Sequence, residues 1–241
     1  MGLADRGEAR TEPLRGRGLG RVRPGQGGPV RLPDPDDLGQ RGALVADLRD
    51  VGEPYGGAVA LQLALRRPDA VASLTLYEPV RFALLFGARG LAAAGDEIVG
   101  VGRHIAALAA AGDSHAAAAQ FVAYWSGAAA WQSMPRSRQD AVAARMTKVR
   151  AEFAALFDDA VPACAYAALT MPVRLLRGDA SPLPARGVAS RLNELLPCAT
   201  LVTLRGGVHM QPVSDPCSVV AALPHWLARR RAEETALVAA G

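Results

Sequence analysis

The sequence predicts an α/β fold, in which helices cover a parallel β-sheet, and two observations carry this prediction. Strand-like and helix-like segments alternate in residues 56–80 and again in residues 172–231. Such alternation is typical of parallel strands that are joined by helical crossovers. Between the two regions, residues 81–169 are rich in alanine and have apolar residues at helical spacing, which indicates a long helical insertion.

The beginning of the chain has a different composition. Residues 1–37 are rich in Gly, Arg and Pro and show neither a helical nor a strand period. Such a segment buries too little apolar surface to offset the entropy of ordering, so we expect it to be disordered. Residues 38–51 carry apolar side chains near helical spacing and predict a helix, which ends before Gly52 and Pro54.

The remaining elements follow in order. A helix is expected after Gly57 and ends near Pro68, and the apolar run VASLTLYEPV predicts a buried strand. After the insertion, PVRLLRG predicts a strand, ARGVASRLNELLP a helix, ATLVTLRG a further strand and SVVAALPHWLARRR a closing helix. We therefore divide the chain into a core over residues 38–80 and 170–235 and an insertion over residues 81–169.

Length and composition indicate one soluble domain. The 241 residues suffice for a substantial core, since half of them are hydrophobic. No apolar run reaches the roughly 18 residues of a membrane span, and no apolar leader segment begins the chain. The three cysteines have no metal-type spacing, and an odd number favours a reducing compartment. We expect a cytoplasmic protein without a metal or another cofactor.

The net charge of +4 does not indicate a nucleic-acid partner. Residues 1–33 hold seven Arg against three acidic residues, which accounts for the whole excess. No aromatic residues that could stack on bases accompany this basic segment. We expect a small-molecule substrate or ligand and neither a nucleic-acid nor a membrane partner, and the oligomeric state stays open.

Five stretches of the sequence resemble a known family. They are YGGAVALQLALRRPDAV, LTLYEPV, FVAYWSG, PVRLLRGDASP and LRGGVHMQPVSDP. In this order, over residues 38–231, they resemble the lid-bearing α/β hydrolases. The resemblance implies a hydrolase of esters or related acyl compounds that works through a serine, a histidine and an acid. It identifies residues 81–169 as the lid, and it implies a truncated sheet, because the third to fifth strands of the family are not recognisable.

The resemblance assigns a base and leaves two candidates for the acid. His209 follows the strand ATLVTL through RGGV and matches the base of the family. Asp179, in the loop after PVRLLRG, and Glu78, after VASLTLY, are both candidates for the acid that orients it. The frequent family position is filled by Ser181, so Asp179 would act from two residues earlier, or would only cap the helix that follows.

The nucleophile is missing. In the G-x-S-x-G turn of the family a serine stands between strand and helix, and without a gap Pro54 takes its place in GEPYG. That alignment puts Arg49 and Asp50 into a buried strand at substantial desolvation cost. We prefer a second interpretation, a deletion between VGEP and YGG that removed the fifth strand together with the serine. Neither interpretation leaves a nucleophile, so we expect little or no hydrolysis.

Three aromatic residues are candidate substrate contacts. Tyr55 would follow the missing serine, and Tyr124 and Trp125 would line the lid and an apolar pocket beneath it, although packing alone is the alternative role for all three. Two alternatives to an enzyme stay open. One is a ligand-binding pseudoenzyme, and the other is a broken gene product in which a misassembled or out-of-frame segment replaces the N-terminal half of the core.

Overall fold

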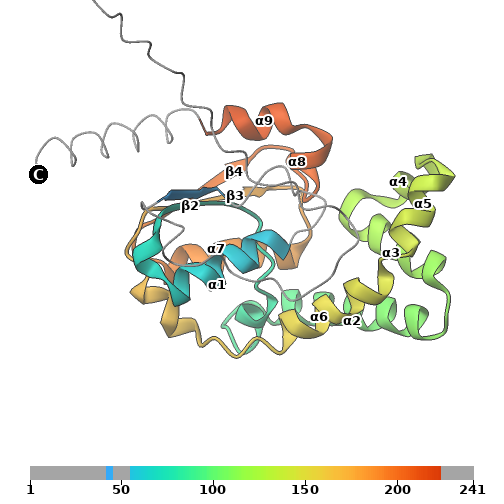
Figure 1. The fold of residues 1–241 in the computed structure, drawn as a ribbon, viewed down its shortest axis with the longest axis horizontal. Helices are drawn as coiled ribbons and strands as arrows, with labels where there is room; N and C mark the ends of the chain where they lie inside the picture. The colour runs from blue at the N-terminus through green and yellow to red at the C-terminus, as the bar shows by residue number, and fades with distance from the viewer. Residues whose placement is uncertain (1–41, 46–54, 224–241) are drawn as a thin grey trace, which may run out of the picture. The chain divides into compact units, whose positions relative to one another are not determined.

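The computed structural model describes residues 42–45 and 55–223 (Figure 1). The chain divides into two compact units, Met1–Asp37 and Leu38–Gly241, and all the described residues belong to the second. The disorder predicted for residues 1–37 therefore lies outside the described residues, as does most of the closing helix predicted after residue 218. Within the described residues, no helix is both long and apolar enough to cross a membrane.

Four parallel strands form the sheet. They are β1 (Gly42–Val45), β2 (Val71–Tyr77), β3 (Val173–Gly178) and β4 (Ala199–Leu204), in the order β1-β2-β3-β4. The three adjacent pairs are all parallel, with Leu44 opposite Leu74 and Leu175 opposite Leu201. Strands β2, β3 and β4 agree with the sequence prediction, because each is a short apolar run with few alternatives to a buried strand.

Strand β1 corrects the prediction for residues 38–51. A helix is expected there, but Gly42–Val45 is a strand that pairs with β2. The run GALV is too short for its apolar spacing to distinguish a strand from a helix, and pairing along β2 decides between them. Strand β1 therefore pairs with β2 and precedes α1 in the chain. The deletion interpretation expects no strand at this place. Residues 46–54, including Pro54, lie outside the described residues.

Two helices connect the strands. Helix α1 (Tyr55–Arg66) and the 3-10 turn η2 (Pro68–Ala70) lead into β2, and α7 (Leu183–Leu195) joins β3 to β4. In Figure 1 both helices lie on one side of the sheet, and α9 (Pro216–Ala221) lies on the other. Leu61 of α1 and Val188 of α7 are fully buried in the core. This arrangement is the helical crossover that parallel strands require.

The helical insertion joins β2 to β3. Its elements are η3 (Phe82–Leu85), α2 (Ala92–Ala110), α3 (Ser114–Ser126), α4 (Ala128–Ser133), α5 (Arg136–Ala143), α6 (Met146–Phe157) and η4 (Ala163–Ala168). Asp113 caps α3 by accepting from the amide of Ala116, 2.9 Å away. Gly127, at φ 92°, ends α3, a conformation that favours glycine.

The insertion shares an aromatic core with the segment after β2. Phe82 stacks on Trp125 of α3 and on Phe153 of α6, with ring centroids 6.4 Å apart in both pairs. Gly102 of α2 lies so close to the ring of Phe157 that an added Cβ would stand 2.9 Å from it. The helices of the insertion therefore pack against one another and against the residues that leave the sheet.

A buried ionic cluster ties the two ends of the insertion together. Arg81, at its start, forms an ion pair with Asp159 at 2.5 Å. The same guanidinium donates to the hydroxyl of Tyr166 at 2.7 Å and to Gln62 of α1 at 3.3 Å. Burial raises the pKa of Tyr166 above its usual value, so its hydroxyl stays protonated at neutral pH.

Candidate active site

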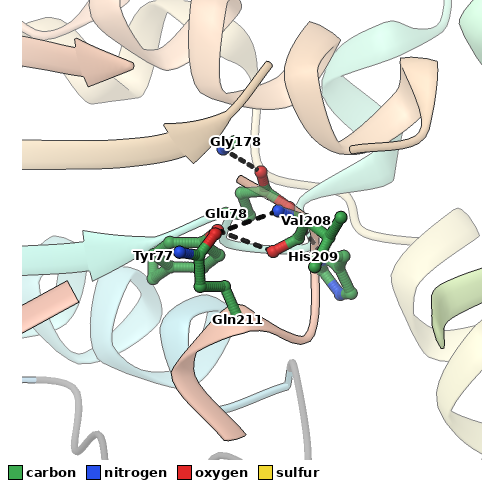
Figure 2. A network of polar contacts seen from close by, with 6 residues as sticks. All are labelled: Tyr77, Glu78, Gly178, Val208, His209 and Gln211. Carbon is green, nitrogen blue, oxygen red and sulfur yellow. Dashed lines mark hydrogen bonds and ion pairs between the residues drawn. The ribbon is translucent and has the colours of Figure 1, made fainter. Parts of the chain in front are cut away.

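Glu78 and His209 form a buried pair at the carboxyl ends of the strands (Figure 2). The Nδ1 atom of His209 lies 2.7 Å from Oε2 of Glu78, and their side chains are 2% and 0% exposed. Glu78 directly follows β2, its amide donates to the carbonyl of Leu176, and its φ is 41°. A buried glutamate in this left-handed conformation is unusual, and such strain clusters at functional sites.

The second oxygen of Glu78 is held by β3. The amide of Gly178 donates to Oε1 at 2.6 Å, so each carboxylate oxygen has a partner, as a buried charge requires. Gly178 has to be glycine, because a Cβ there would stand 2.1 Å from the carbonyl oxygen of Gly207. This close approach brings the loop after β4, which carries His209, directly over the end of β3.

Two hydrogen bonds fix the loop beside His209. The hydroxyl of Tyr77 donates to the carbonyl of Val208 at 2.7 Å, and the amide of Val208 donates to Oε1 of Gln211 at 3.1 Å (Figure 2). Burial, and then the charge of Glu78, raise the pKa of Tyr77, so its hydroxyl remains a donor. The loop is thus anchored to the last residue of β2, next to the carboxylate that His209 contacts.

The other ring nitrogen of His209 has no hydrogen-bond partner among the described residues. A carboxylate accepts hydrogen bonds, so Nδ1 carries the proton in this contact, and a neutral imidazole then has its lone pair on Nε2. Within residues 55–223, Nε2 is buried and has no hydrogen-bond partner. The indole of Trp125, from the insertion, packs on the imidazole with ring centroids 4.1 Å apart. In this arrangement Glu78 and Trp125 hold the imidazole, and Nε2 is left available for a further contact.

Asp179 does not contact His209. Its carboxylate is exposed and accepts from the amide of Gly206 at 2.6 Å, which closes the turn after β4. Of the two candidates for the acid, only Glu78 touches the histidine. The alternative that Asp179 caps the next helix also differs from the structure, because Asp179 bonds the turn after β4.

The start of α1 packs against the segment that follows Glu78. Gly57 lies so close to Pro79 that an added Cβ would stand 2.9 Å from the proline Cβ. Tyr55 is the first residue of α1, where the residue after the nucleophile is expected. The first turn of α1 thus lies near the segment that carries Glu78, while Pro54, which takes the serine position in the ungapped alignment, lies outside the described residues.

A cavity of about 570 Å³ extends between the insertion and the loop after β4. Trp125 lines it, as predicted, together with Val208 and Met210, which flank His209 in sequence. Tyr124 does not line it, because its hydroxyl donates to Glu97 at 2.6 Å and its ring packs edge-on against Trp125. Phe82 and Phe153 also line the cavity, and sequence reasoning missed them because only their packing reveals the wall.

The described residues contain no group of His, Cys, Asp and Glu side chains that could hold a metal ion. Cys164, Cys198 and Cys217 are all exposed and free. The candidate site therefore consists of the Glu78–His209 pair, the indole of Trp125 and the adjacent cavity.

A scan of protein-family models and a search of curated proteins give no match. Among solved structures, an α/β hydrolase enzyme from a Medee basin deep-sea metagenome library is similar at a TM-score of 0.52 and 16% identity, covering 70% of this chain and 60% of that enzyme. The 2-hydroxy-6-oxo-6-phenylhexa-2,4-dienoate hydrolase from Rhodococcus sp. strain RHA1 gives a TM-score of 0.49 at 18% identity, covering 70% of this chain and 59% of that enzyme.

The chain therefore has the α/β-hydrolase fold, in a truncated form. It spans about 60% of the length of the metagenomic hydrolase that it resembles. Its four parallel strands, with the helical insertion between β2 and β3, agree with the architecture that the sequence resemblance implies. At this level of identity the likeness concerns the fold, and the chemistry depends on the residues of the site itself.

Proposed function

We propose that this chain carries the base and the acid of a hydrolase of esters or related acyl compounds but lacks the nucleophile. The observation that supports this proposal is the buried Glu78–His209 contact at 2.7 Å, with Nε2 of the histidine left without a partner in residues 55–223. In such a site the histidine removes the proton of the nucleophile, and the acid orients the ring and stabilises its protonated form. His209 is the proposed base and Glu78 the proposed acid.

The first step of that reaction needs an attacking atom, and the sequence before α1 offers none. Residues 46–54 read ADLRDVGEP and contain no serine, threonine or cysteine. Pro54 has neither a hydroxyl nor a thiol, so no acyl-enzyme can form on residue 54. Loss of the nucleophile in a related triad lowers the rate by several orders of magnitude. We therefore expect the rate of ester hydrolysis with this protein to equal the rate in buffer alone.

A second candidate function is ligand binding without catalysis. It is favoured by the cavity of about 570 Å³, which lies in the range of about 300–1,000 Å³ that is common for small-molecule sites. In this interpretation the helical insertion acts as a lid over the pocket. The cytoplasm remains the expected compartment. A broken gene product, the third alternative, would lack a cooperative unfolding transition and ligand-induced stabilisation.

Hydrolysis of p-nitrophenyl butyrate tests the proposal. Full-length protein and the His209→Ala variant should show the same rate, because the base has no nucleophile to activate. Activity of the unmodified chain that disappears in His209→Ala would refute the proposal. The variant Pro54→Ser asks whether a serine alone restores the site. A gain in rate that also requires His209 and Glu78 would support the assigned roles and favour the ungapped alignment over the deletion.

A further inference from the structure

We propose that Trp125 is a positioning residue for His209, so that the helical insertion supports the base and also forms a wall of the cavity. The inference rests on the proposed function, because it names a further residue on which the Glu78–His209 pair depends. It is carried by one contact. The indole of Trp125 lies on the imidazole with ring centroids 4.1 Å apart and ring planes inclined at 34°.

The imidazole needs a second support besides Glu78. The contact of Nδ1 with Oε2 at 2.7 Å fixes one point on the edge of the ring. The last side-chain torsion of histidine has broad minima, so the torsion itself holds the ring only weakly. Packing against one face of the ring resists this rotation. The indole of Trp125 therefore keeps the Nδ1–H bond of His209 directed at the carboxylate.

Trp125 is itself held in place within the insertion. Its ring stacks with Phe82 at a centroid distance of 6.4 Å and meets the ring of Tyr124 edge-on at 4.6 Å. The hydroxyl of Tyr124 donates to Glu97 of α2 at 2.6 Å, and Trp125 is only 4% exposed. Side chains that are locked by their own packing can position a neighbour precisely. The surroundings of Trp125 therefore suit a residue that supports another one.

A second histidine provides a comparison within the same molecule. Nε2 of His115 lies 3.2 Å from Oδ1 of Asp140, and the ring of Trp131 is also next to it. There the rings meet edge-on, with centroids 6.2 Å apart and planes at 65°. The side chain of His115 is 41% exposed, against 2% for His209. Both histidines thus contact a carboxylate beside a tryptophan, but of the two only His209 is buried with an indole over its face.

Proton exchange at His209 tests the proposal on the full-length protein. Nitrogen NMR of the imidazole gives the population of the tautomer protonated on Nδ1, and proton NMR gives the rate at which that proton exchanges with water. Trp125→Leu should lower this population and speed the exchange about two- to tenfold, the range expected from the loss of one aromatic pair. Trp125→Phe keeps an aromatic ring, so it should restore part of the difference.

Two control variants separate positioning from a general loosening of the core. Phe153→Leu removes another buried ring of the same aromatic core, but Phe153 stacks on Phe82 rather than on His209. Trp131→Leu removes the indole of the comparison pair. Neither change should alter the tautomer or the proton exchange of His209. Circular dichroism establishes that each variant is folded, and Trp125→Phe carries the test if Trp125→Leu does not fold.

The outcomes separate this inference from the function on which it rests. Faster exchange at His209 in the Trp125 variants, absent from both controls, would support the proposal. Unchanged exchange in the folded Trp125 variants, or an equal increase in Phe153→Leu, would overturn it. If Glu78→Gln alters the tautomer while the Trp125 variants do not, only the role of Trp125 is wrong. If none of these changes alters it, the Glu78–His209 pair itself lacks the proposed role, and the inference falls with it.

Discussion

Two buried ionic networks begin within three residues of each other, and they differ in the parts of the chain that they join. Glu78 and Arg81 both lie in the segment that leaves β2, and both side chains are almost completely buried. The guanidinium of Arg81 contacts Asp159, Tyr166 and Gln62. In the other network both oxygens of Glu78 are bound, but Nε2 of His209 has no partner within residues 55–223.

The difference agrees with a structural role for the Arg81 cluster and with the role proposed for His209. The Arg81 cluster joins α1 to both ends of the helical insertion, so its partners hold the fold together. An unpaired buried nitrogen contributes nothing to stability and costs the desolvation of a polar atom. The unpartnered Nε2 atom is what the proposed role of His209 as a base requires, because a base needs a free lone pair.

The largest effect is expected from the structural network. Arg81→Met should lower the free energy of unfolding by about 3 kcal/mol, because it leaves the carboxylate of Asp159 mostly buried without its cation. Urea denaturation measures this change. Arg67→Met is the matched control, since Arg67 forms an exposed ion pair with Asp69 and should cost less than about 0.5 kcal/mol. Similar losses in the two variants would mean that the Arg81 cluster does not stabilise the fold.

A smaller effect on stability, with a distinct spectroscopic signature, is expected from the acid. Glu78→Gln should cost about 2 kcal/mol, because it removes the charge from two short hydrogen bonds. It should also weaken the preference of His209 for the tautomer protonated on Nδ1, which nitrogen NMR of the imidazole reports. Glu97→Gln is the control, because Glu97 accepts from Tyr124 and does not contact His209. An unchanged tautomer in Glu78→Gln would contradict the role of Glu78.

Patterns among neighbouring residues predicted those helices and strands that such patterns determine. Strands β2, β3 and β4 and helix α7 follow from short apolar runs and helical spacing. Strand β1 was predicted wrongly, because its pairing with β2 is not encoded in the four residues GALV. The packing of Trp125 on His209 joins residues far apart in the chain, and no motif in the sequence marks it.

The choice between the two acids shows the same limit at the site. Asp179 and Glu78 both follow strands whose carboxyl ends lie at one edge of the sheet, so spacing alone could not separate them. The decision depends on the backbone. Glu78 adopts a φ of 41° and lies under the His209 loop, whereas the amide of Asp179 bonds Leu204 and its carboxylate bonds the turn at Gly206.

The smallest effect is expected at Asp179, the other candidate for the acid. Asp179→Ala removes an exposed hydrogen bond to the amide of Gly206, and water can replace it, so the loss should be about 0.5–1 kcal/mol. The His209 tautomer should stay as in the unmodified protein, in contrast to Glu78→Gln. The same nitrogen NMR measurement decides the point. If Asp179→Ala altered the tautomer as strongly as Glu78→Gln does, the histidine would depend on the turn after β4 as much as on its buried carboxylate. Glu78 could then no longer be distinguished from the turn at Gly206 as the group that orients His209.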